Sequence, residues 1–152
     1  MRSALILMSA VALIGCAGGE EEMPADTPAA AMAAPLSFAD VAGTWSVQSM
    51  AETSDSVLIT FTLNATADGT GWTMTFPNRP EPVPLTVAVD GDSLIMDAGP
   101  YMSALRAEST MVTLRSVSRI QDGMMMGTFT AHYDTQSPDS VLRGRTQGTR
   151  VP

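Results

Sequence analysis

The sequence predicts an all-β domain, an antiparallel up-and-down barrel of about eight strands that follows a short helical turn. Apolar and polar residues alternate with a period of two through four successive segments, which is the pattern of strands with one buried face. Glycine, asparagine, aspartate and proline separate these segments and provide turns. The strands are short and evenly spaced, which favours closure, and closure removes the edges on which another chain could pair.

The first half of the domain is the most regular. Ser37 and Asp40 have the spacing of a capping box, so we expect one helical or 3₁₀ turn there. The four alternating segments follow, with large apolar residues on one face and mainly threonine on the other. They lie at residues 45–47, 57–64, 72–76 and 83–90.

The second half alternates less cleanly. We expect residues 93–97 to pair back across the turn at Asp90 and Gly91. Residues 101–108 show no clear pattern and are compatible with a short helix. The last three strands are expected at residues 111–120, 124–133 and 141–151.

Residues 1–15 have the pattern of a signal peptide. Arg2 precedes an apolar stretch of about eleven residues, whereas a helix that spans a bilayer needs about 20. The stretch ends in Leu13-Ile14-Gly15-Cys16, which resembles the bacterial lipobox recognised by signal peptidase II. The resemblance implies cleavage before Cys16, a diacylglycerol on its sulfur and an acyl chain such as palmitate on its amine. The alternatives are an ordinary secretory signal with a chance cysteine, or a buried structural cysteine.

Residues 16–36 predict a flexible tether between this lipid anchor and the barrel domain at residues 37–152. The segment is rich in alanine, proline, glycine and glutamate, and has little to bury. Ala17 stands where lipoproteins retained in the inner membrane usually have aspartate. The resemblance therefore implies the outer membrane, with the domain facing the periplasm or the cell surface, if the source has such a membrane.

The charge of the chain limits its partners. The formal net charge is −8, lysine is absent, and no basic patch for nucleic acid is evident. Such an acidic domain is not drawn to anionic lipid by charge, so membrane attachment depends on the acyl chains of Cys16. Cys16 is the only cysteine, which excludes a disulfide within one chain.

The motif Gly43-Thr44-Trp45 resembles the opening of lipocalin-like and avidin-like barrels. In lipocalins the tryptophan closes one end of the barrel and an arginine near the end of the last strand lies across its ring. The resemblance therefore implies that Trp45 and Arg150 form a barrel-closing pair. The domain is shorter than a typical lipocalin and has no helix after its last strand. Residues 71–76 look avidin-like, but Val47 occupies the place of an asparagine that contacts biotin.

We expect no catalytic, metal or cofactor site. His132 is the only histidine, and although Asp134 is near it, no nucleophile elbow accompanies them. The methionines at 124–126 are soft ligands suited to copper(I), but neighbouring strand residues point to opposite faces, which favours core packing. Arg115 and Arg119 share a strand face and would bind an anion if that face lined the lumen; a solvated outer face is the alternative.

Two classes of function remain. The barrel binds or carries a small apolar ligand without catalysis, or it is filled by its own side chains and serves as a structural or protein-interaction module of the cell envelope. A cavity above about 300 Å³ would favour the carrier. We expect Gly144 and Gly148 to leave room beside the last strand. The residues predicted to line a ligand cavity are Phe61, Trp72, Met74, Phe76 and Met96.

Overall fold

The computed structural model describes residues 35–106 and 109–152. Cys16, the predicted signal peptide and the predicted tether up to residue 34 lie outside the described residues. Within the described part, the chain forms a short helix, α1 (Phe38–Val41), and then eight strands. The strands are β1 (Gly43–Ala51), β2 (Val57–Ala65), β3 (Thr73–Phe76), β4 (Arg79–Asp90), β5 (Ser93–Met102), β6 (Met111–Gln121), β7 (Met124–Tyr133) and β8 (Val141–Arg150).

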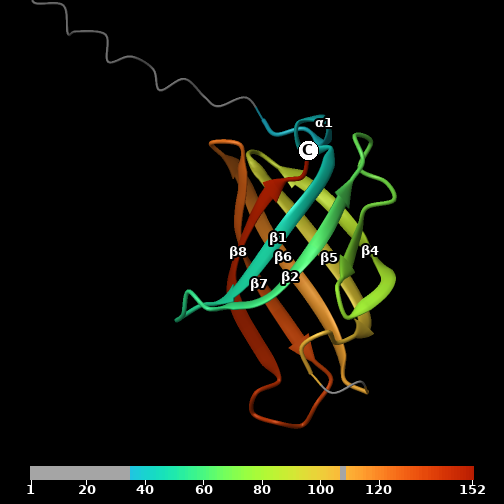
Figure 1. The fold of residues 1–152 in the computed structure, drawn as a ribbon, viewed down its shortest axis with the longest axis vertical. Coiled ribbons are helices and arrows are strands. Elements are labelled where there is room, and N and C mark those ends of the chain that lie inside the picture. Colours follow the sequence, from blue (N-terminus) through green and yellow to red (C-terminus); the bar gives the residue numbers. More distant parts are fainter. Residues whose placement is uncertain (1–34, 107–108) are drawn as a thin grey trace, which may run out of the picture. The chain divides into compact units, whose positions relative to one another are not determined.

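The eight strands form a closed antiparallel barrel (Figure 1). Each strand pairs with its neighbours in the chain, and β8 returns to pair with β1, where Arg150 lies opposite Trp45. The predicted fold class, an all-β up-and-down barrel with a short helical turn before it, is confirmed.

Alternation along the strands separates the lumen from the outer face. In β2 Leu63 is buried while Thr62 and Asn64 are exposed, and β8 repeats this pattern with Thr146 buried beside exposed Arg145. Because successive side chains of a strand point to opposite faces, the apolar set of each strand fills the barrel interior.

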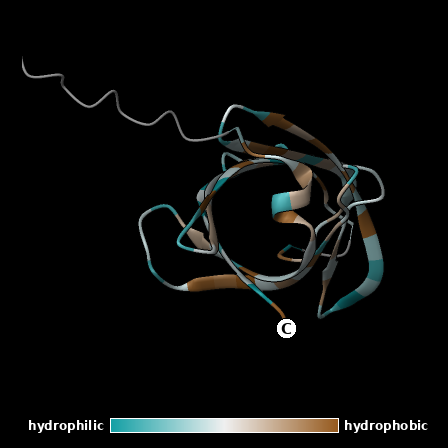
Figure 2. Ribbon diagram, turned by 90° about the horizontal axis from the view of Figure 1, so that it is seen from above, coloured by the Kyte–Doolittle hydropathy of each residue, from teal (hydrophilic) through white to brown (hydrophobic). Residues whose placement is uncertain are grey.

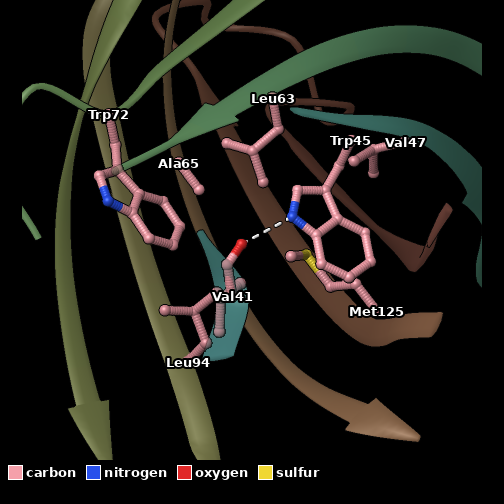
Figure 3. Packing of buried hydrophobic residues seen from close by; sticks show 8 residues of the cluster. All are labelled: Val41, Trp45, Val47, Leu63, Ala65, Trp72, Leu94 and Met125. Carbon is pink, nitrogen blue, oxygen red and sulfur yellow. Dashed lines mark hydrogen bonds between the residues drawn. The ribbon is translucent and has the colours of Figure 1, made fainter. Parts of the chain in front are cut away.

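The helix α1 lies across one end of the barrel, within the ring of strands seen from above in Figure 2. Val41 is fully buried, and its carbonyl accepts a hydrogen bond of 2.8 Å from Trp45 Nε1 (Figure 3). The ring of Phe38 meets that of Trp72 edge-on at a centroid distance of 6.0 Å. This end of the barrel is therefore filled by a cluster that we call the closed end: Val41, Trp45, Val47, Leu63, Ala65, Trp72, Leu94 and Met125.

Residues 101–106 do not contain the short helix that their sequence allowed. β5 continues to Met102, and the chain then turns at Ser103, whose hydroxyl accepts hydrogen bonds from the backbone amides of Leu105 and Arg106. A serine side chain that satisfies nearby amides favours a turn over a helix. No helix in the described part of the chain has the length and hydrophobicity needed to cross a membrane.

Candidate ligand site in the barrel lumen

The closed end is held by Arg150, the last residue of β8. Its guanidinium carbon lies 4.5 Å from the ring centroid of Trp45, which is cation–π geometry. The same guanidinium donates hydrogen bonds to the carbonyls of Ala42 and Asp40, at the end of α1. The structure thus brings together the two residues that the lipocalin resemblance paired, and it adds the helix as a third partner.

Beyond the closed end, the lumen contains a small cavity with mainly apolar walls. About 60 Å³ of it is free for the centres of water-sized molecules. Phe61, Met74, Phe76 and Met96 are among the residues that line this cavity. Trp72 does not line it; its ring belongs to the closed end, and its Nε1 donates a hydrogen bond of 2.9 Å to the carbonyl of Thr66.

The cavity is small compared with ordinary ligand sites, which occupy about 300–1,000 Å³. Because one water needs about 10–15 Å³ of such free volume, 60 Å³ holds roughly four to six waters or a slender chain segment. The expectation that Gly144 and Gly148 leave room was wrong for a physical reason. A Cβ on Gly144 would lie 2.5 Å from the Phe129 ring, and one on Gly148 would lie 3.2 Å from Val47, so neighbouring side chains already occupy both places.

The far end of the cavity reaches the β5–β6 connection, opposite α1, through Ser103, Ala104 and Leu105. Tyr101 stacks on Phe76 there at a centroid distance of 6.0 Å. The pKa of the Tyr101 hydroxyl, ordinarily 10.0, is raised further by burial, so the group stays neutral far into the alkaline range. Leu105 is exposed, so an apolar side chain stands at this mouth.

The lumen also contains buried hydroxyls, which the sequence analysis does not predict. Ser116, Ser118 and Thr146 are buried, and their hydroxyls have no hydrogen-bond partner among the residues described. Ser116 and Thr146 line the cavity. The alternation along β6 could have predicted their burial, because Ser116 and Ser118 continue the series of inward positions that begins with Val112 and Leu114.

The other candidate groups lie on the outer face of the barrel. His132 and Asp134 are exposed. Arg115 pairs with Asp97 at 3.0 Å and Arg119 with Asp92 at 3.3 Å, with all four side chains largely exposed. These arginines therefore do not form an anion site in the lumen.

The methionine run splits across the barrel wall. Met125 is buried in the closed end, whereas Met124 and Met126 are half-buried. Over residues 35–106 and 109–152, no three histidine, cysteine or acidic residues are grouped so that they could hold a metal ion.

Comparison of the chain with models of known protein families, with curated proteins and with solved structures gave no match. The closed eight-stranded antiparallel barrel is compatible with a lipocalin-like fold.

Proposed function

We propose that this chain is a lipid-anchored protein of the bacterial cell envelope whose lipocalin-like barrel binds a slender apolar molecule without catalysis. The observation that supports ligand binding best is the small apolar cavity, whose lining extends from residues of the closed end to the β5–β6 connection. Its lining includes three methionines, Met74, Met96 and Met125, whose unbranched side chains adapt readily to an inserted chain.

The anchor is proposed from the lipobox-like residues 13–16. Acyl chains on Cys16 would hold the acidic domain at the outer membrane, facing the periplasm or the cell surface, and the tether would let it stand off the lipid. We expect Cys16→Ser to leave an uncleaved or soluble precursor that no longer partitions with membranes. If the serine variant still sedimented with membranes after a high-salt wash, the proposed anchor would be wrong.

A second function, a filled barrel that acts as a structural or protein-interaction module of the envelope, is favoured by one observation. The free volume of 60 Å³ is well below the usual range for ligand sites, and bulky side chains take up most of the lumen. In this alternative the closed end and the methionines serve packing alone.

Quenching of tryptophan fluorescence by a brominated fatty acyl probe distinguishes the two functions. Both tryptophans, Trp45 and Trp72, lie in the closed end, so a chain that enters the lumen brings bromine toward them. We expect saturable quenching in the wild type and weaker quenching in Ala104→Phe, which adds bulk where the cavity reaches the β5–β6 connection.

Val117→Phe is the matched control, because Val117 is exposed on the outer face of β6. It should leave quenching unchanged. Absence of saturable quenching in the wild type, together with a native mass spectrum free of co-purified lipid, would support the filled barrel.

A further inference from the structure

Four hydroxyl-bearing side chains gather on one wall of the lumen. The strand register places Ser49 opposite Thr146, Thr146 opposite Gly127, and Gly127 opposite Ser118, so these residues form one row across β1, β8, β7 and β6. Ser116 is the next inward residue along β6. We call Ser49, Ser116, Ser118 and Thr146 the hydroxyl cluster.

The hydroxyl cluster is deeply buried. The exposed fractions are 7% for Ser49, 4% for Ser116, 1% for Ser118 and 7% for Thr146. The hydroxyls of the last three have no hydrogen-bond partner in the described part of the chain. A buried polar group without a partner destabilises a protein, and such groups in native structures call for an explanation.

Gly127 keeps the middle of the row free of a side chain. A Cβ at this position would lie 2.3 Å from Ser118 Oγ and 2.4 Å from the carbonyl oxygen of Val117. The Ser118 hydroxyl therefore occupies the space that a side chain on β7 would fill. Along this row the inward-facing side chains are hydroxyls, whereas those nearer the closed end are apolar.

The chemistry of the wall limits what can pair with it. Each hydroxyl both donates and accepts a hydrogen bond. None of the described residues that line the cavity carries a charge, and the pKa of Tyr101 is raised by burial. A carboxylate placed here would lose its hydration without gaining a cation, which is costly.

We propose that the hydroxyl cluster is a subsite for an uncharged hydrogen-bonding group of the ligand, an alcohol, ester or amide carried on an apolar chain. This group would bind against three members of the cluster that line the cavity, Ser49, Ser116 and Thr146. Ser118 does not line the cavity; it continues the row on β6, opposite Gly127. The inference rests on the proposed function and adds a ligand class to it: neutral amphiphiles, in preference to plain hydrocarbons and to ionised fatty acids.

The test compares three probes of equal chain length, 1-decanol, n-decane and decanoate at pH 8, by their displacement of the brominated acyl probe. We expect the wild type to prefer decanol over each of the others by about tenfold. Decane lacks the hydrogen bond that decanol makes in the buried site, and decanoate loses the hydration of its charge there. Thr146→Val, which removes the hydroxyl at nearly constant volume, should reduce the preference for decanol over decane. Thr149→Val is the matched control, because Thr149 is exposed on the same strand.

Equal affinity of the wild type for decanol and decane would overturn the subsite while leaving the proposed function intact. Displacement of the bromine probe by none of the three compounds, together with absent quenching, would overturn both proposals. If Thr146→Val fails to fold, Ser116→Ala gives the same comparison, and the selectivity of the wild type already decides the matter.

Discussion

At the scale of single residues, Arg150 has more partners than a cation–π pair requires. Its guanidinium lies over the Trp45 ring and also donates to two carbonyls at the end of α1. One side chain therefore links the last strand, the first strand and the helix. Because the charge sits on delocalised, planar nitrogen donors, lysine could not make the same set of contacts.

We predict that Trp45 and Arg150 are energetically coupled. Trp45→Ala should lower the free energy of unfolding by about 3–5 kcal/mol, as a large-to-small change in a core. Arg150→Ala should cost less, through lost packing of its stem and lost hydrogen bonds. A double-mutant cycle measured by denaturant unfolding should give a coupling of about 0.5–3 kcal/mol, since effects of contacting residues do not add.

Arg143→Ala is the matched control for this cycle, because it removes an exposed arginine from the same strand. Its effect should stay within about 0.5 kcal/mol and should add to that of Trp45→Ala. A cycle for Trp45 and Arg150 that is additive within error would contradict the role assigned to the pair.

Gly144 and Gly148 are predicted to differ in their tolerance of a methyl group. A Cβ at Gly144 would lie 2.1 Å from the carbonyl oxygen of Met50 and 2.5 Å from the Phe129 ring, so backbone must move. At Gly148 the nearest atoms are side-chain carbons at 3.2 Å. Gly144→Ala should therefore cost about 1–3 kcal/mol and Gly148→Ala less, by chemical denaturation. The reverse order would show that the β8–β1 seam is packed differently.

At the scale of elements, α1 is too short to be stable on its own, because helix nucleation is unfavourable. Its capping box and its contacts with the closed end hold it. The Asp40 carboxylate accepts hydrogen bonds from the Ser37 amide at 2.9 Å and the Ser37 hydroxyl at 2.7 Å. These bonds, first of all the one from the Ser37 hydroxyl, lower the pKa of Asp40 below its ordinary value of 3.8.

This lowered pKa predicts a pH-dependent effect of Asp40→Asn. The carboxylate stabilises the folded protein above pH 3.8, and the stabilisation is lost as the pH falls through the folded-state pKa. The variant should therefore have a lower Tm than the wild type at pH 7, and the difference should narrow in strong acid. Asp134→Asn, which removes an exposed carboxylate remote from α1, controls for net charge. A Tm difference that is constant with pH would contradict the cap.

The elements that sequence predicted well are those in which local chemistry and barrel packing agree. The capping box at Ser37 forms as its spacing predicts. The alternation of apolar and polar residues in β2 matches the alternation of its buried and exposed faces. Residues 101–106 were ambiguous because their turn depends on one serine side chain. The hydroxyl cluster could not be predicted from sequence, because inward-facing serine and threonine residues of different strands cannot be placed beside one another until the register is known. Alternation predicts the face on which a side chain lies but not its height in the barrel, so the sequence could not predict that Trp72 lies in the closed end and not beside the cavity.

At the scale of the whole molecule, the pairing of β1 with β8 is the contact that defines the barrel. It joins segments about a hundred residues apart, so its formation closes a loop that spans nearly the whole domain. It also removes the two free edges that an open sheet of these strands would expose. The closed end and the lumen both depend on this seam, because Trp45, Val47 and Ser49 face residues of β8 across it.

A disulfide across this seam should therefore stabilise the protein strongly. Ser46 and Thr149 are paired across β1 and β8, and antiparallel partners have Cα atoms about 4.5–5.5 Å apart, within the range that a disulfide spans. In a Cys16→Ser background, the oxidised double variant Ser46→Cys, Thr149→Cys should gain about 2–4 kcal/mol over its reduced form, because cross-linking constrains a long loop of the unfolded chain. Denaturant unfolding with and without reductant measures this gain, and each single cysteine variant serves as a control for the substitutions. Failure of the two thiols to pair under mild oxidation would contradict the predicted proximity of Ser46 and Thr149, and oxidised and reduced forms that unfold at the same denaturant concentration would contradict the predicted gain.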